Sequence, residues 1–338
     1  MASHPPVDTL GRALQSLRIS VTDRCNLRCQ YCMPAEIYGK DFAFLPKREI
    51  LTFEELQMVA AAFVKLGVHQ IRVTGGEPLL RKDIAVLINQ LRDLGPEIDL
   101  SLTTNGTRLG QLATALKNAG LNRVNVSLDS LDPQTASTLA GRPVEPERIW
   151  KNILHARQSG LSAKVNCVIK RGLNEDAVFP LAERCRQEGI TLRFIEFMDV
   201  GTTNEWHQKQ VVTGREVLEK LSQRWPLRPV SNQSFTETAR RYRYEDGAGE
   251  VGFINSISEP FCRGCNRARL SADGTLYTCL FASRGWPVKR WIRQDGLSAV
   301  GLQDRIADCW GRRDDRYSEL RGAGAETSGR PEMWTLGG

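Results

Sequence analysis

The sequence predicts an α/β protein built on a parallel sheet, because short apolar runs alternate with longer amphipathic segments from Leu17 to Met198. The apolar runs have the length of strands, and the amphipathic segments have the length of helices. Six strand–helix pairs in succession imply a parallel sheet with helices packed outside it. Periodicity alone leaves open whether this sheet closes as a barrel or opens as a doubly wound sheet.

The elements can be placed from this pattern. The expected strands are Leu17–Val21, Gln70–Thr74, Asp99–Thr103, Arg123–Leu128, Ala163–Ile169 and Leu192–Phe197. The expected helices are Thr52–Leu66, Lys82–Leu94, Leu109–Ala119, Pro146–Ser159 and Glu175–Glu188. Thr52 and Glu55 have the spacing of a capping box, and Gly67 is placed to end that helix. Later in the chain, Arg240–Ile254 has the pattern of a hairpin.

Composition and charge exclude several classes of protein. The chain of 338 residues is 41% hydrophobic and 25% charged, as in an ordinary globular protein. No stretch approaches the roughly 20 apolar residues of a membrane helix, and residues 1–8 lack the apolar core of a signal peptide. The net charge of +7 suits a small anionic substrate, but it forms no basic stripe of the kind that binds nucleic acid. We therefore expect a cytoplasmic protein with no membrane and no nucleic-acid partner.

Three cysteines near the N-terminus, Cys25, Cys29 and Cys32, carry the strongest chemical signal. At this spacing all three thiols fit one short loop and can reach one metal centre. Iron–sulfur cubanes take one thiolate per iron, so three cysteines leave one iron open to another ligand. Zinc is the alternative, but a structural zinc site takes four Cys or His ligands, and no His lies between residues 5 and 68.

A second group of three cysteines, Cys262, Cys265 and Cys279, lies near the C-terminus. Asp273-Gly274 is a two-residue turn signal, and a hairpin there would return Cys279 towards Cys262. A zinc ribbon completed by Cys309 or a distant His is the alternative. Nine cysteines in a chain with no export signal indicate metal binding rather than disulfides.

The first loop, with an aromatic residue just before its last cysteine, resembles the radical S-adenosylmethionine (SAM) enzymes. The resemblance implies a partial (βα)6 barrel whose [4Fe–4S] cluster binds SAM at its open iron. Together with the second cysteine group, the Arg267-Ala268-Arg269 run and the terminal Gly337-Gly338 resemble the GTP 3′,8-cyclase family of molybdenum cofactor biosynthesis. This closer resemblance extends from about residue 17 to residue 338.

The family resemblance implies a division of the chain. Residues 1–198 would form the radical SAM partial barrel. Residues 199–338 would form a C-terminal region with a second, auxiliary [4Fe–4S] cluster and a Gly-Gly tail that reaches the active site. By the same resemblance, the residues expected to contact SAM are Tyr31, Gly76, Ser127 and Met198. The residues expected to contact GTP are Arg18, Arg72, Thr103, Lys164, Arg267, Ala268 and Arg269.

Part of the GTP site also has independent support from the residues. Arg18, Arg72, Lys164 and Arg193 all fall in expected strands, where an unpaired buried charge is costly. Four such cations favour a polar cavity for an anion, although each could instead face solvent if the strand register differs. Arg193 is the weakest of the four and receives no role. Ala268 stands where the resemblance leads us to expect a threonine, which removes one side-chain contact.

The resemblance implies a reaction: conversion of GTP to (8S)-3′,8-cyclo-7,8-dihydroguanosine 5′-triphosphate by a lyase that uses SAM and two [4Fe–4S] clusters. An electron donor would be needed, and cyclic pyranopterin monophosphate synthase would receive the product. The alternative enzyme is a radical SAM protein that modifies a peptide and carries an auxiliary cluster. The alternative from another class is a non-catalytic metal-binding module with two zinc sites. The sequence does not decide the oligomeric state, and a homodimer is one of the options.

Overall fold

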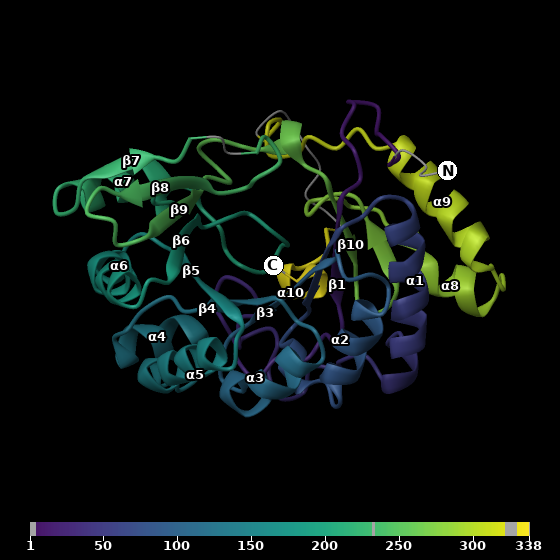
Figure 1. Cartoon of the computed structure of the whole chain (residues 1–338), viewed down its shortest axis with the longest axis horizontal. Coiled ribbons are helices and arrows are strands. Elements are labelled where there is room, and N and C mark those ends of the chain that lie inside the picture. The colour runs from purple at the N-terminus through teal and green to yellow at the C-terminus, as the bar shows by residue number, and fades with distance from the viewer. Residues whose placement is uncertain (1–4, 232–233, 322–329, 338) are drawn as a thin grey trace.

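Residues 16–196 form six parallel strands connected by helices, as the alternating pattern predicts. The structure, a computed structural model, describes residues 5–231, 234–321 and 330–337 (Figure 1). The strands are β1 (Ser16–Ser20), β2 (Gln70–Thr74), β3 (Asp99–Thr104), β4 (Arg123–Ser127), β5 (Ser162–Ile169) and β6 (Thr191–Glu196). The helices are α1 (Phe53–Lys65), α2 (Ile84–Arg92), α3 (Leu109–Asn118), α4 (Pro133–Ala140), α5 (Pro146–Gln158) and α6 (Val178–Gln187).

These six strands pair in chain order and curve into an arc, with α1 to α6 on its outer side (Figure 1). The expected (βα)6 partial barrel is therefore confirmed, and the doubly wound alternative is excluded. The capping box of Thr52 and Glu55 forms at the start of α1, and Gly67 follows its end with φ of 94°. Helix α4 has no counterpart among the expected helices, because its eight residues are too few to show a helical period.

The C-terminal region extends the same sheet at both edges. Beside β1 lie β10 (Arg267–Leu270), β11 (Thr275–Tyr277) and β12 (Trp286–Pro287), and the β10–β11 hairpin turns at Asp273-Gly274 as predicted. Beside β6 lie β9 (Glu250–Ile254), β8 (Arg240–Tyr244) and β7 (Leu227–Pro229), which confirms the second predicted hairpin. The pairs β1–β10 and β6–β9 are parallel, so both edges continue the barrel rather than begin another sheet.

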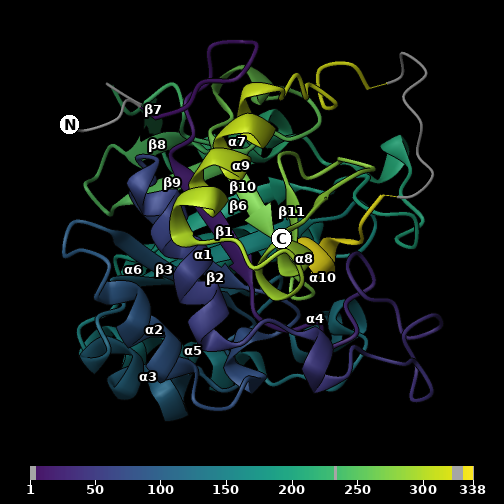
Figure 2. The same ribbon diagram turned by 90° about the vertical axis from the view of Figure 1, so that its right-hand side faces the viewer.

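The remaining helices cover the ends of this sheet. They are α7 (Gly214–Ser222), α8 (Val288–Arg293), α9 (Ala299–Gly311) and the short C-terminal α10 (Met333–Leu336). Helix α9 packs against α1 on the outside, and Figure 2 shows this pair from the side. By contrast, α10 lies inside the arc next to β1, so residues 333–336 reach the interior of the barrel (Figure 1). None of the helices in the described ranges has the length and apolar character needed to cross a membrane.

Strand alternation gives the sheet an apolar outer face and a cationic inner face. In β1, Leu17 and Ile19 are fully buried in the core, and Arg18 between them points to the other side. The register then sets Arg18 opposite Arg72 on β2 and opposite Arg269 on β10. The apolar core therefore lies between sheet and helices, and the inner face is left for chemistry.

Glu196, the last residue of β6, connects this strand to the C-terminal region. Its side chain is 2% exposed and accepts hydrogen bonds from the Gly214, Ile257 and Ser258 backbone N–H groups at 2.8 to 2.9 Å. The Ser258 hydroxyl donates to the same carboxylate at 2.5 Å. One buried carboxylate thus fixes the first turn of α7 and the loop after β9 against the barrel.

We expect Glu196→Ala to lower the free energy of unfolding by roughly 3 kcal/mol, because it leaves several buried donors without an acceptor. Urea unfolding of the cluster-free protein, followed by circular dichroism, measures this change. Glu97→Ala, at an exposed position before β3, is the control and should change stability by less than about 0.5 kcal/mol. Equal unfolding midpoints for the two variants would contradict the role given to Glu196.

Candidate functional site

The inner face of the barrel holds three adjoining pockets. The first contains Cys25, Cys29 and Cys32, and the second contains Cys262, Cys265 and Cys279. The third is lined mainly by charged and polar side chains from the first halves of the strands. Asn166, Ile195 and Met198 line both cysteine pockets, whereas Arg18, Arg72, Arg193 and Arg267 line both the second and third pockets. The pockets therefore form a series, with the second cysteine group between the first and the cations.

The first cysteine loop lies against the C-terminal ends of β2 and β3. Gly76 N–H donates to the Thr22 carbonyl, and Glu77 N–H donates to the Arg24 carbonyl, both at 2.8 Å. A Cβ on Gly76 would collide with the Arg24 carbonyl group, so only glycine allows this approach. The Thr74–Pro78 segment is consequently fixed beside the cysteines, as the sequence motif indicates.

The acidic groups of the first pocket are buried and carry raised pKa values. Burial raises the pKa of Glu77 to about 7, although its carboxylate accepts from Thr104 Oγ1 and from the Leu79 and Asn105 backbone N–H groups. Burial likewise raises the pKa of Asp129 to about 6, and the hydroxyl of Tyr31 donates to this carboxylate at 2.7 Å. The Tyr31–Asp129 bond connects the cysteine loop to the end of β4.

The residues of the first pocket fit a metal cluster. Burial raises the pKa of the Cys25 thiol to about 11 and raises that of Cys29 well above its usual value. Buried thiols of this kind stay neutral unless a metal takes the place of the proton. Thr103 Oγ1 and Asn166 Oδ1, at the same pocket, are buried and lack a hydrogen-bond partner within the described part of the chain. Such atoms indicate a ligand that supplies the missing partner.

The second cysteine pocket differs from the first because arginine side chains surround one of its thiols. Burial opposes ionisation of Cys265, but the guanidinium groups of Arg267, Arg313 and Arg269 outweigh it and lower the pKa of the thiol to about 5. Arg267 Nη2 donates to Cys265 Sγ at 3.4 Å, and its guanidinium lies 5.0 Å from the centre of the Phe261 ring. A ready thiolate among cations fits an iron–sulfur cluster with three cysteine ligands. Cys309 lies in the apolar core on α9, away from this pocket, which removes it as a fourth ligand.

The third pocket gathers more cations than carboxylates: Glu237 and Glu250 line it but pair with Arg241, and Arg123 pairs with Asp99. Arg18, Arg72, Arg267 and Arg269 form no ion pair within the ranges that the structure describes. Burial and then repulsion from Arg269 lower the pKa of Arg18, and burial followed by repulsion from Arg193 lowers that of Arg72 to about 9. Burial and Arg193 lower the pKa of Lys164 to about 8. An anion is the natural partner for such a group.

The structure brings most of the expected site residues together, in two sets. Tyr31, Gly76, Ser127, Met198 and Thr103 line the first pocket. Arg18, Arg72 and Arg267 line the second and third pockets, Arg269 lines the second, and Lys164 lines the third. Ala268 lies in the apolar core on the face of β10 opposite its two arginine neighbours, so its side chain does not reach the cavity. Gly337 packs against Thr74, and Gly338 lies outside the described residues.

Several cavity residues were missed or undervalued from the sequence. Arg193 lines two pockets, donates to Asn125 Oδ1 at 3.1 Å, and has its pKa lowered to about 10 by burial and by Arg123. Asn166 is two residues after Lys164 on β5, so alternation alone could have placed both on one face. Asn105 and Glu77 follow strand ends, which is the signal that could have identified them.

Comparisons with known proteins agree with this geometry. Residues 19–185 match the radical SAM superfamily, and residues 190–319 match the family described as Molybdenum Cofactor Synthesis C. The SAM-bound structure of SuiB from Streptococcus suis has a TM-score of 0.62 at 16% identity, covering 91% of this chain and 68% of SuiB, and shares the fold. The fold and the first cysteine site therefore define a radical SAM enzyme.

Two curated relatives identify the family within the radical SAM superfamily to which the chain belongs. The chain is 48% identical to the GTP 3′,8-cyclase of Acidothermus cellulolyticus over 330 residues, which cover 96% of this chain and 91% of that protein. It is 46% identical to the GTP 3′,8-cyclase of Staphylococcus aureus over 317 residues, with 94% and 93% covered. The chain belongs to the GTP 3′,8-cyclase family.

We expect Gly76→Ala to weaken SAM binding at least about tenfold, a loss of roughly 1.4 kcal/mol, because the added methyl group must displace the Arg24 backbone beside Cys25. Equilibrium binding of SAM to the anaerobically reconstituted protein measures the effect. Gly311→Ala is the matched control, since a Cβ there meets nothing within 4 Å. Wild-type SAM affinity in Gly76→Ala would contradict the assignment of this segment.

Proposed function

We infer that the protein is a radical SAM lyase that converts GTP to (8S)-3′,8-cyclo-7,8-dihydroguanosine 5′-triphosphate in molybdenum cofactor biosynthesis. The observation that carries this inference is the cluster of buried cations on the inner face, next to the second cysteine pocket. A triphosphate carries about four negative charges at neutral pH and needs several cationic donors. Family membership supplies the identity of the nucleoside.

The order of the pockets supports an orientation for GTP. The triphosphate would lie in the third pocket, where Arg72, Lys164 and Arg193 neutralise it. The guanine would lie in the second pocket, beside the cysteines and between Arg267 and Arg269. The ribose would then face the first pocket through the gap lined by Asn166, Ile195 and Met198. The expected GTP contacts of Arg18 and Thr103 agree with this placement, and Ala268 could contribute only backbone atoms.

The protein itself would bind, orient and shield the reactants. Cys25, Cys29 and Cys32 would hold one [4Fe–4S] cluster, and Cys262, Cys265 and Cys279 would hold the other. When bound, the first cluster and SAM supply one-electron chemistry that removes a hydrogen atom from the substrate and leaves methionine and 5′-deoxyadenosine. The expected SAM contacts Tyr31, Gly76, Ser127 and Met198 would fix SAM between the cluster and the ribose. Met333 and Trp334 of α10 line the same pocket and would limit the access of water.

The proposal extends to the location of the enzyme, its partners and the division of its chain. We propose a cytoplasmic enzyme that takes electrons from a separate donor and passes its product to cyclic pyranopterin monophosphate synthase. We also retain the division into a barrel of residues 1–198 and a C-terminal region of residues 199–338. Peptide modification is the weaker alternative, since the likeness to SuiB concerns the fold alone and a peptide would not supply four clustered charges.

Product analysis tests the proposed function directly. The protein is reconstituted anaerobically with iron and sulfide and reduced with SAM and GTP that carries deuterium at C3′. Liquid chromatography then separates the cyclised isomer from GTP, and mass spectrometry follows the deuterium into 5′-deoxyadenosine. Loss of one hydrogen from C3′ and gain of one electron and one proton give a product with the formula of GTP, accompanied by GTP-dependent 5′-deoxyadenosine. 5′-Deoxyadenosine formed while GTP stays unchanged would overturn the cyclase assignment and favour the peptide alternative.

GTP affinity should fall as the pH rises through about 8, because the free protein then loses the Lys164 ammonium group and must take up a proton to bind the anion. Between pH 8 and the ordinary lysine pKa of 10.5, the decrease in GTP affinity approaches tenfold for each pH unit. Equilibrium dissociation constants for GTP between pH 7 and 9.5 measure the effect. In Lys164→Arg the charge persists, so the fall that begins near pH 8 should be lost, and only the later fall from Arg72, whose pKa is about 9, should remain. The same pH dependence in both proteins would exclude Lys164 from the triphosphate site.

Cys265→Ser should separate the two cysteine sites. We expect it to retain part of the uncoupled cleavage of SAM, which depends on the first site, and to abolish formation of the cyclised product. Both are measured in one assay, as 5′-deoxyadenosine and as cyclised nucleotide. If Cys265→Ser cyclises GTP at the wild-type rate, the second site has no part in substrate binding.

A further inference from the structure

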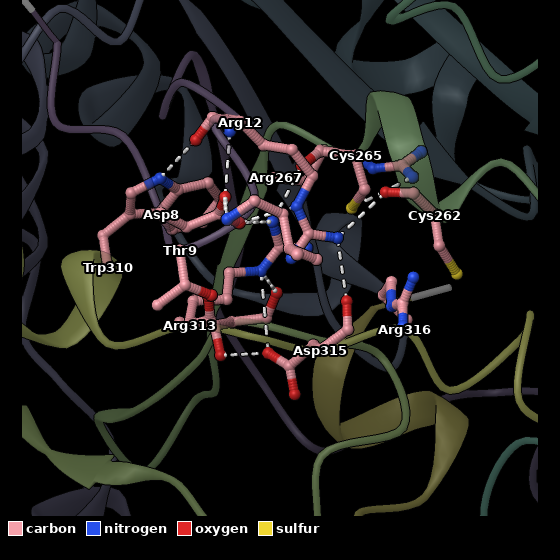
Figure 3. A network of polar contacts seen from close by, with 12 residues as sticks. Asp8, Thr9, Arg12, Cys262, Cys265, Arg267, Trp310, Arg313, Asp315 and Arg316 are labelled. Carbon is pink, nitrogen blue, oxygen red and sulfur yellow. Dashed lines mark hydrogen bonds and ion pairs between the residues drawn. The ribbon is translucent and has the colours of Figure 1, made fainter.

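The second cysteine site is held by side chains from both ends of the chain. Asp8 and Arg12 precede β1, Arg313 follows α9, and all three side chains are almost completely buried (Figure 3). Asp8 Oδ2 accepts from Arg12 Nε at 2.6 Å and from Arg313 Nη1 at 2.9 Å. A single carboxylate thus aligns two guanidinium groups, and we call these three residues the Asp8 clamp.

The clamp binds all three cysteine-bearing segments through their backbone carbonyls. Arg12 Nη1 donates to the Cys262 carbonyl at 2.9 Å, and Arg313 Nη1 donates to the Cys265 carbonyl at 2.9 Å. Arg313 Nε donates at 3.0 Å to the carbonyl of Thr278, the residue before Cys279. Two forked side chains therefore set the relative positions of all three ligating segments.

The clamp is itself fixed from several directions. Trp310 Nε1 donates to the Arg12 carbonyl at 2.9 Å, and the Arg313 guanidinium lies 4.5 Å from the centre of the Trp310 ring. Arg12 Nη1 also donates to the Asp315 carbonyl, and Asp315 Oδ2 accepts from the Thr278 hydroxyl at 2.6 Å. Figure 3 shows the dashed contacts that link Arg12 and Arg313 to Asp8 and to the backbone of Cys262 and Cys265.

The first cysteine site is held by nearer contacts, which include the Tyr31–Asp129 bond and backbone bonds from Arg28 and Gln30 to the end of α4. Its cysteines lie within eight residues, and bonds inside its own loop hold it: Cys32 N–H donates to the Cys29 carbonyl at 2.9 Å, and Arg28 Nη1 donates to the Cys25 carbonyl at 2.8 Å. In the second site, thirteen residues separate Cys265 from Cys279. Closing a longer loop costs more entropy, and residues that orient metal ligands from outside commonly meet that need.

We propose that the Asp8 clamp positions Cys262, Cys265 and Cys279 for the second cluster, and that its guanidinium groups raise the reduction potential of that cluster. Positive charge near a cluster favours its more negative, reduced form. Asp8, Arg12 and Arg313 are thus positioning residues that act through the cysteines without touching the substrate. The inference rests on the second cluster of the proposed function and is independent of which substrate binds there.

Asp8→Asn tests the positioning role with little change of shape. After anaerobic reconstitution we expect iron to fall from about eight towards four per chain, while SAM-dependent changes in the electron paramagnetic resonance of the first cluster persist. In the cluster-free protein, hydrogen exchange of residues 262–279 should accelerate, with the six barrel strands unchanged. Asp308→Asn is the control: Asp308 accepts from Arg312 on the exposed side of α9, so the same chemical change there should leave the iron content at eight.

A second pair of variants separates charge from geometry. Arg313→Lys keeps the positive charge but replaces two directed donors by one ammonium group, whereas Arg313→Gln removes the charge. We expect both to lower the iron content, and only Arg313→Gln to lower the midpoint potential of the second cluster that remains. A purely structural role would give that cluster the same potential in both variants. This pair also decides the matter if Asp8→Asn fails to fold.

Full iron content, wild-type potentials and unchanged exchange of residues 262–279 in these variants would overturn the clamp. Failure of the substrate assignment would look different. In that case the wild-type protein would hold about eight irons and leave GTP unchanged, and the iron content of the clamp variants would still fall.

Discussion

Repulsion between buried guanidinium groups on the inner face of the sheet is the constraint around which the protein is organised. Arg18, Arg72 and Arg269 occupy neighbouring strands at one level of the register, without carboxylate partners in the described chain. Their charge is tolerable because the outer face of the same strands is packed with apolar side chains that supply stability. The inner face therefore stays electrostatically unsatisfied until an anion binds, and under the proposed function that anion is the triphosphate of GTP.

The two groups of three cysteines are brought together in two different ways. The first is contained in one loop that braces itself and lies against the Thr74–Pro78 segment. The second joins strand β10, its hairpin, the segment before β1 and the segment after α9, so its cysteines come together only when β10 has paired with β1. Through the Asp8 clamp, the N-terminal segment and the segment after α9 both hold this one site. About three hundred residues separate these two segments in the sequence.

Sequence patterns between neighbouring residues predicted the strands, helices and turns of this protein better than they predicted contacts between distant segments. The six strands, the capping box of Thr52 and both hairpins follow from periodicity and turn residues, and the structure confirms them. The cysteine spacing was enough to propose both metal sites. Arg193 and Asn166 were undervalued because strand register decides which residues face inward, and register depends on pairing between distant strands. The clamp was missed for the same reason: nothing near Asp8 in the sequence indicates Arg313.

The most direct measurement is equilibrium binding of GTP, GDP and guanosine to the fully reconstituted protein under anaerobic conditions. If the inner-face cations hold the polyphosphate while the second site holds the base, affinity should fall stepwise from GTP to GDP to guanosine. The GTP advantage should also shrink as salt screens the charges. Equal affinity for guanosine and GTP would contradict the central claim that the unneutralised cations of the barrel determine what this enzyme binds.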